Sequence, residues 1–297
     1  MKPAAPLAFR GILLMILAVS LFPIADGIAK RLTSEIPIMQ IIWGRYAFQM
    51  VFILFYIGVA HPWRVVRTER FRLQAARAFA GWASNIPFIT ALAFIPIADA
   101  FAASLVAPLM VTALSVPLLG EQVGIRRWTA VAFGFAGALI VARPGLGLVH
   151  WATMLPLASA ALFAFYQIGA RQLASTDRAT TTFFYATTVG FVINSVILPF
   201  VWVPMSLELW GLMALMGLLF ALSHLALTKA FDFGAASVLA PFVYFQIASA
   251  TVVGFVFFGD LPDRWTIVGT LIVIASGLYV AYRESRISLP LRAREGA

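Results

Sequence analysis

Apolar segments long enough to cross a membrane follow one another along nearly the whole chain, and they restrict the fold more than any other feature. A helix of about twenty apolar residues matches the hydrocarbon thickness of a bilayer. The segments are continuously apolar rather than alternating, which favours helices over a closed barrel, the other structure that lipid permits. We predict an all-α integral membrane protein with ten transmembrane helices, at residues 7–32, 38–59, 73–95, 97–118, 128–143, 150–173, 180–200, 207–231, 235–258 and 265–283.

Composition excludes several classes of protein. Of the 297 residues, 62% are hydrophobic and 11% are charged, so ten spans leave no room for a separate soluble domain. The chain has no cysteine, which excludes disulfides, thiolate metal sites and cysteine nucleophiles. No small-residue cleavage site follows the first apolar segment, so we expect that segment to remain as the first helix.

The positive charges indicate the topology. Cytoplasmic loops of membrane proteins carry an excess of Lys and Arg. Of the 21 Lys and Arg residues, sixteen fall on the side of the N-terminus, Arg45 lies within a span, and four fall on the other side: Lys30, Arg31, Arg143 and Arg264. We therefore expect both termini on the cytoplasmic side of the membrane. The net charge of +9 reflects this topology and contact with anionic lipids, not nucleic acid.

The first half of the sequence returns in weaker form in the second half. ASLVAP at Ala103–Pro108 returns as ASVLAP at Ala236–Pro241, and Asp99 and Asp232 precede the two copies at the same offset. A further stretch, SLFPIADGIAKRLTSE, aligns without a gap to ALFAFYQIGARQLAST.

An odd number of spans in each copy requires that the second copy is inserted upside down. The expected domains are two inverted five-helix repeats, at 7–143 and 150–283, around a central cavity, with a cytoplasmic basic tail at 284–297. Inverted repeats are typical of secondary transporters, whose substrate site lies between the repeats near the membrane midplane.

Several longer motifs resemble a known family. They are ASLVAPLMVTALSVPLLGEQVGIRRW and its repeat ASVLAPFVYFQIASATVVGFVFFGDLPDRW, each followed by a glycine-bearing helix, and the opening FPIADGIAKRL with WGRYAF. The chain resembles the drug/metabolite transporter superfamily, specifically its EamA-type ten-helix carriers, over essentially its full length. The resemblance implies a carrier of the bacterial inner membrane, built around a central cavity. It is similar to exporters of amino acids, aromatic ones included, and to carriers of other small metabolites.

Two opposite charges lie inside the first two spans. Asp26 and Arg45 are each roughly 10 Å deep at 1.5 Å per residue, which permits a direct pair. We expect an intramembrane ion pair that locks the two spans together. The alternatives are a direct substrate contact, a proton-coupling role for Asp26, and a pair between Asp26 and Lys30 one turn away.

Polar and aromatic residues at mid-depth are the candidates for the lining of a cavity. Hydrogen bonding between helices is the simpler role for any one of them. As a set, they indicate that some line a water-accessible path through the bundle. His224 is also a candidate proton sensor, because histidine titrates near neutral pH. The candidate substrate-binding residues are Ser20, Trp82, Asn85, Tyr166, His224 and Tyr244.

Prolines inside the apolar segments mark positions where helices bend. Pro108 and Pro241 occupy equivalent positions of the repeat, and each frees the carbonyl one turn earlier. We expect them to shape the cavity and to act in gating, together with Pro23 and Pro87.

These features favour a secondary transporter that exports small polar metabolites, foremost amino acids, by alternating access without an ion gradient. The alternatives are a proton-coupled carrier of another metabolite or drug-like compound, and an ion channel. No hydrolase, metal-site or nucleotide-binding motif is present, so we expect no enzyme activity, no cofactor and no metal. The expected partners are a small molecule and membrane lipids, with the chain as a monomer or a weak homo-oligomer.

Overall fold

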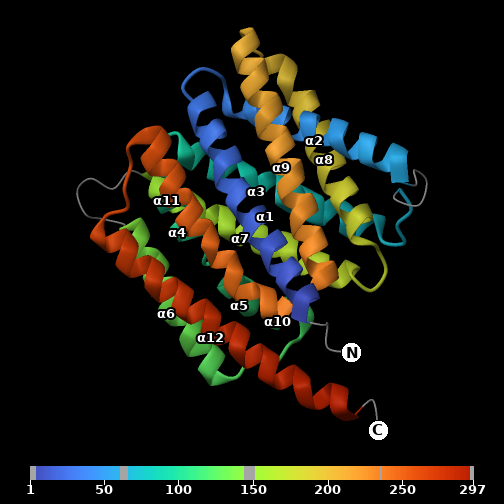
Figure 1. The fold of residues 1–297 in the computed structure, drawn as a ribbon, viewed down its shortest axis with the longest axis vertical. Coiled ribbons are helices and arrows are strands. Elements are labelled where there is room, and N and C mark those ends of the chain that lie inside the picture. The colour runs from blue at the N-terminus through green and yellow to red at the C-terminus, as the bar shows by residue number, and fades with distance from the viewer. Residues whose placement is uncertain (1–4, 61–65, 144–150, 235, 295–297) are drawn as a thin grey trace.

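The computed structural model describes residues 5–60, 66–143, 151–234 and 236–294, and these are almost entirely helical (Figure 1). The first half contains α1 (Ala5–Leu32), α2 (Ile38–Ala60), α3 (Phe71–Leu92), α4 (Ile97–Ser104), α5 (Ala107–Leu119) and α6 (Ile125–Ala142). The second contains η1 (Trp151–Met154), α7 (Leu155–Leu173), α8 (Ala179–Val201), α9 (Leu207–Phe233), α10 (Ala236–Leu239), η2 (Ala240–Tyr244), α11 (Phe245–Phe258) and α12 (Arg264–Arg294).

These elements form ten successive helical segments, because α4 with α5, η1 with α7, and α10 and η2 with α11 each follow one another as one segment. By length and composition, nine segments of the described residues qualify as membrane spans. The tenth is α3, which contains two arginines and an asparagine and is less apolar. The described residues therefore have the predicted all-α architecture of ten helical segments.

Two of the ten segments are interrupted at the equivalent prolines. The helix breaks between α4 and α5 at Leu105–Val106, and Pro108 lies in the first turn of α5. In the second half, Pro241 lies in η2, the 3-10 turn between α10 and α11. A proline cannot donate a helical hydrogen bond, so it is tolerated where a new helical stretch begins. Pro23 and Pro87 lie inside α1 and α3, which continue past them.

The segments that carry these breaks also end in the same way. Gly120 follows α5 with φ of 69°, and Gly259 follows α11 with φ of 70°. In each case the N–H of the next residue donates back across the turn, from Glu121 to Ser115 and from Asp260 to Gly254. This left-handed cap favours glycine, which has no Cβ to clash.

Helix packing follows a regular pattern across the two halves. The most extensive pairs are α1 with α9, α3 with α7, and α6 with α12. The first five segments correspond in order to the last five, so α1 corresponds to α7 and α3 to α9. The α1–α9 pair of one arrangement is then the α7–α3 pair of the other, and α6 and α12 are each other's counterparts. Figure 1 shows α6 and α12 side by side, and α1 next to α9.

The α6–α12 contact is made by backbone. A Cβ on Gly137 would lie 2.8 Å from the Gly269 carbonyl oxygen, and a Cβ on Gly269 would lie 2.5 Å from the Gly137 carbonyl oxygen. Each helix therefore needs its glycine for the other to come this close.

Contacts between loops gather at the two ends of the bundle. At one end, Thr68 donates to the Asp177 carboxylate at 2.6 Å, and Arg171 lies 3.7 Å from Glu121. At the other end, the Arg143 guanidinium pairs with Asp263, which accepts hydrogen bonds from the first backbone N–H groups of α12. Successive segments therefore run in opposite directions between two faces.

A few expectations differ from the structure or lie outside it. Helix α12 continues to Arg294, past residue 283 where the last span was expected to end and through most of the expected basic tail. Lys2 and Arg64 of the basic side, the start of the second expected repeat at 150, and the last three residues of the tail lie outside the described residues.

Candidate functional site

A buried ion pair joins α1 to α2. The Nη2 of Arg45 donates to Oδ1 of Asp26, and the two residues expose only 1% and 4% of their surface. The pair keeps two charges that are each costly in hydrocarbon in contact with one another. Lys30 does not pair with Asp26. Its ammonium donates to the Ile95 carbonyl at 2.6 Å and lies 3.8 Å from Asp260.

Arg45 also connects α2 to α3. Its Nη1 donates to Oδ1 of Asn85 at 3.0 Å. The Asn85 amide nitrogen in turn donates to the Tyr46 hydroxyl at 3.1 Å and to the Gly81 carbonyl at 2.7 Å. The Arg45 Nε–H has no partner among the described residues. Asn85 is only partly buried, so this end of the polar network is less enclosed than the ion pair.

Four aromatic side chains surround the other side of Arg45. We refer to Phe22, Phe183, Phe220 and His224 as the ring cluster. The centroid of the His224 ring lies 5.1 Å from each of the three phenylalanine rings, which come from α1, α8 and α9. The Arg45 guanidinium lies 4.2 Å from the Phe220 centroid. Cation–π contact therefore makes the polar network and the ring cluster one continuous site.

A second buried arginine lies between α3 and α7. The Arg77 guanidinium is 3.8 Å from the centroid of the Tyr166 ring, and its Nη1 donates to the Thr182 carbonyl at 3.2 Å. Two glycines make room for these side chains. A Cβ on Gly169 would lie 2.9 Å from the Arg77 Cβ, and one on Gly81 would lie 2.5 Å from the Tyr166 ring. Each large side chain thus packs on a glycine of the facing helix.

The sequence did not single out Arg77, Phe22, Phe183 or Phe220. The topology predicts Arg77 among the sixteen basic residues of the cytoplasmic side. The sequence does not distinguish the three phenylalanines of the ring cluster from the others, since 26 phenylalanines are spread along apolar helices. The glycines at positions 81 and 169 were the available signal for Arg77, since small residues permit close helix packing.

The structure brings Asn85, Tyr166 and His224 together around the two arginines, but places the other expected lining residues elsewhere. Trp82 is buried one turn before Asn85 and contacts the Phe79 ring at 5.3 Å. The Ser20 carbonyl accepts a hydrogen bond of 2.9 Å from Ser249 on α11.

Tyr244 packs against α12. A Cβ on Gly277 would overlap the Tyr244 hydroxyl, so this glycine provides the space for the ring. Tyr244 therefore lies in a different contact from the ring cluster. The Ser223 hydroxyl is also turned away, because it donates to the Leu219 carbonyl of its own helix at 2.7 Å.

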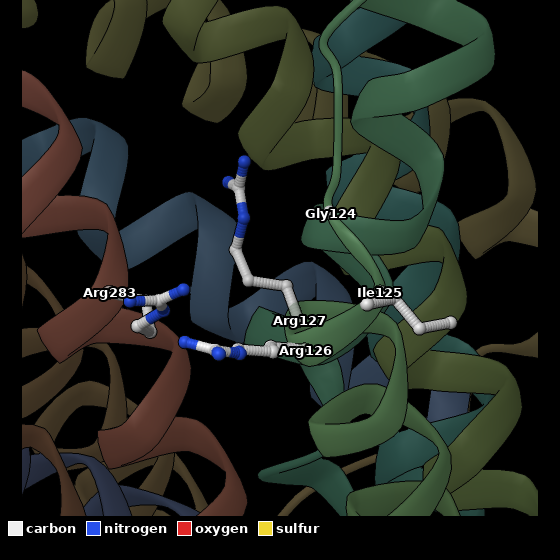
Figure 2. A pocket seen from close by; sticks show the side chains of 5 residues that line it. All are labelled: Gly124, Ile125, Arg126, Arg127 and Arg283. Atoms are coloured by element: carbon white, nitrogen blue, oxygen red, sulfur yellow. The ribbon is translucent and has the colours of Figure 1, made fainter.

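A pocket on the surface carries positive charge but is separate from this site. Figure 2 shows Arg126 and Arg127 at the start of α6 and Arg283 on α12 around a pocket of about 220 Å³. The Arg127 Nη2 donates to the Gln122 carbonyl at 2.7 Å. The pocket marks the basic end of the bundle, not its interior.

The interior site offers hydrogen-bond donors and ring faces rather than reactive groups. Among the described residues, no cluster of three His, Asp or Glu residues is arranged to hold a metal ion. The side chains of the site are suited to bind a small organic molecule that has both a flat apolar part and polar atoms.

Comparison with known proteins shows which families the chain is similar to. Residues 9–143 match the model of the EamA-like transporter family. The riboflavin transporter of Vibrio cholerae is 28% identical over 94% of this chain and 95% of its own length. The pseudopaline exporter of Pseudomonas aeruginosa is 25% identical over 90% and 94%. The S-adenosylmethionine uptake transporter of Rickettsia prowazekii is 22% identical over 96% and 97%.

A solved crystal structure has the same fold, with a TM-score of 0.64 and 15% identity over 93% of this chain and 97% of that one. The relatives named above are transporters, which confirms that the chain is not an enzyme. They move chemically different molecules, and in different directions by their names. The chain is a multi-pass membrane transporter of small molecules; its residues 9–143 match the EamA-like transporter family, and over its length it is similar to carriers of the drug/metabolite transporter superfamily.

Proposed function

We propose that this transporter carries small aromatic metabolites through the site at Arg45 and the ring cluster, and that its substrates are amino acids, foremost aromatic ones. The contact between Arg45 and Phe220 is the observation that supports this most directly, because it places a guanidinium with an unpartnered Nε–H against the ring cluster. An aromatic amino acid has one flat apolar part and charged groups at a fixed distance from it. Sites for such ligands combine apolar walls with a few placed polar groups.

Riboflavin is the second candidate. Two relatives, from Vibrio cholerae and Rhizobium johnstonii, carry the name riboflavin transporter and are each 28% identical over 94% of this chain. Aromatic side chains can stack on a flat heteroaromatic molecule as they do on a phenyl ring.

The proposed substrate contacts are Asn85, Tyr166 and His224, which lie around the two arginines. Trp82, Ser20 and Tyr244 line the path farther from Arg45 in this proposal. Asp26 holds Arg45 in place and has no transport role of its own, because its carboxylate is engaged in the ion pair.

For the mechanism, the proposal is alternating access by two inverted repeats, 7–143 and 150–283. The exchange symmetry of the helix pairs supports it, as do the matching glycine caps at Gly120 and Gly259. Pro108 and Pro241 are the proposed bending points, since each starts a new helical stretch inside a segment. The prolines Pro23 and Pro87 curve α1 and α3 next to the site.

We further propose that the protein lies in the bacterial inner membrane as a monomer or weak homo-oligomer, with both termini cytoplasmic. The basic end of the bundle, which includes Arg126, Arg171 and Arg283, would then face the cytoplasmic leaflet and its anionic lipids. In this orientation the cell's own concentration gradient drives net export of amino acids without a coupled ion.

Uptake into proteoliposomes tests the proposal. The panel contains radiolabelled phenylalanine, tyrosine, tryptophan, leucine, glutamate and riboflavin, with and without an imposed proton gradient. We expect saturable movement of the aromatic amino acids that does not require the gradient. Movement of riboflavin alone would support the second candidate. Absence of movement for every compound, or strict dependence on the proton gradient, would overturn the proposed function or its uncoupled mechanism, respectively.

A further inference from the structure

The interior of the bundle contains one positive charge more than its ion pair can neutralise. Arg45 has Asp26 as its counter-ion, whereas Arg77 has no carboxylate within ion-pair distance among the described residues. Arg77 is buried all the same, with only 6% of its surface exposed. Its Nε–H has no hydrogen-bond partner among the residues that the structure describes. The nearby carboxylate of Asp177 is engaged by Gln74 and Thr68, each at 2.6 Å.

A buried guanidinium without a counter-ion is costly, and such charges in membrane proteins usually mark a substrate path. Arg77 is the seventh residue of α3, roughly 9 Å along the helix from its start at 1.5 Å per residue. The Tyr166 ring and the Thr182 carbonyl stabilise the cation, but neither cancels its charge.

The helix packing fixes the position of Arg77. Its aliphatic stem lies against Gly169 of α7, and the Tyr166 ring lies against Gly81 of α3. The Thr182 carbonyl that accepts from Arg77 belongs to the residue directly before Phe183 of the ring cluster on α8. The unpaired charge therefore lies next to the segment of α8 that carries one of these rings.

We propose that Arg77 binds an anionic group of the substrate, a carboxylate foremost, while the ring cluster holds the aromatic part. This rests on the proposed function and narrows its substrate class to aromatic molecules that carry a negative group. A carboxylate can accept two parallel hydrogen bonds from the edge of a guanidinium. The ring of Tyr166 covers a face of Arg77, so it does not compete for that edge, where the Nε–H lies.

A binding experiment tests the proposal with L-phenylalanine and L-phenylalaninamide, which share the ring and the ammonium group and differ in the carboxylate. The melting temperature of the purified transporter in detergent is measured with each compound, because a ligand that binds the native state raises it. The parent should be stabilised more by phenylalanine. Arg77→Gln should respond to the two compounds equally. Arg126→Gln, which removes an exposed arginine at the basic end, should keep the parent's preference.

Transport into proteoliposomes gives the second readout. Arg77→Gln should raise the KM for phenylalanine about tenfold or more, which corresponds to about 1.4 kcal/mol, and Arg126→Gln should leave it unchanged. If Arg77→Gln does not fold, Arg77→Lys keeps the charge with a single point of contact. The Arg77→Lys protein should still be stabilised more by phenylalanine than by phenylalaninamide, but by a smaller difference in melting temperature than the parent.

The outcomes separate the two proposals. A parent that phenylalanine and phenylalaninamide stabilise equally, or an Arg77→Gln protein that keeps the parent's preference, overturns the role of Arg77 and leaves the proposed function standing. A parent that moves riboflavin but no aromatic amino acid overturns the role of Arg77 and supports the second candidate substrate, since riboflavin has no carboxylate. A parent that moves none of the compounds in the panel overturns the proposed function, and the role of Arg77 with it.

Discussion

The carboxylate of Asp26 and the guanidinium of Arg45 are in direct contact in the interior. No other pair of opposite charges in the described residues is buried to this degree. The contact leaves Arg45 free to meet Asn85 on one side and Phe220 on the other. Through these contacts the pair determines where the donors of the proposed substrate site lie.

Asp26→Asn should mainly lower stability. The substitution leaves Arg45 buried without a counter-ion, and breaking a buried pair in this way costs about 3–5 kcal/mol. The melting temperature should fall clearly, and Asp26→Asn with Arg45→Gln should be less affected than Asp26→Asn alone. Asp232→Asn, which removes an exposed carboxylate 3.1 Å from Lys229, is the matched control and should change little. Equal melting temperatures for Asp26→Asn and Asp232→Asn would contradict the assignment.

Gly81→Ala should destabilise the contact between α3 and α7. The new Cβ would lie 2.5 Å from the Tyr166 ring, and overpacking of this kind costs about 1–3 kcal/mol. Gly211→Ala on α9 is the control, because nothing lies within 4 Å of its added Cβ. There alanine should stabilise the helix by up to about 1 kcal/mol. The two variants should therefore shift the melting temperature in opposite directions, and a shared direction would show that Tyr166 moves freely.

Pro108→Ala should slow transport without lowering the melting temperature. Alanine restores the N–H that can bond one turn back to Ser104, which favours one continuous helix in place of α4 and α5. We expect initial rates to fall several-fold, and Pro241→Ala to behave in the same way. Pro37→Ala is the control, since Pro37 precedes α2 directly and interrupts no helix. Unchanged rates in Pro108→Ala and Pro241→Ala would remove both prolines from the gating mechanism.

The contact between Arg143 and Asp263 should depend on pH. Burial tends to raise the pKa of the Asp263 carboxyl, but the Thr266 N–H and the Arg143 guanidinium outweigh it and hold the pKa below its ordinary value of 3.8. A lowered pKa in the folded state means that the stabilisation is complete above 3.8 and is lost as the pH falls through the folded-state pKa. The effect is small, because the carboxylate is nearly half exposed.

Asp263→Asn measures this effect. Its melting temperature should lie below that of the parent at about pH 6, and the difference should close as the medium is acidified below the ordinary pKa. A difference that stays constant from neutral to acidic pH would mean that the charge of Asp263 contributes nothing.

The absence of cysteine makes the topology directly measurable. Ser175→Cys, between α7 and α8, and Ser34→Cys, between α1 and α2, each replace an exposed serine by a thiol, at opposite ends of the bundle. In intact cells a membrane-impermeant maleimide should label Ser34→Cys, and Ser175→Cys should react only after the membrane is opened. Labelling of both variants from outside would contradict the proposed orientation.

Much of the fold could be predicted from the sequence, because its signals are strong in a membrane protein. Segment length gave the ten helices, and the position of Pro108 and Pro241 indicated the two interrupted segments. The shared depth of Asp26 and Arg45 indicated that they can meet, since an isolated charge at that depth needs a partner.

The site itself was harder to predict because most of these helices are apolar on all sides. The depth of a residue in the membrane can be estimated by counting from the end of such a helix. The hydrophobic pattern does not show which face of the helix points inward. Tyr244 has a suitable depth and yet packs against Gly277 on α12. Arg77 is near a helix start and yet turns inward, because Gly169 on the facing helix leaves space for its stem. Both outcomes depend on a distant glycine, which local sequence does not reveal.

The facing glycines Gly137 and Gly269 limit how a transporter of this design can move. Their backbones touch, and the side chains of Ile272 and Val141 pack beside the same two positions. There is no free space here into which either helix could move closer. In the alternating access proposed above, we therefore expect the two halves to pivot at this contact and to open around Arg45.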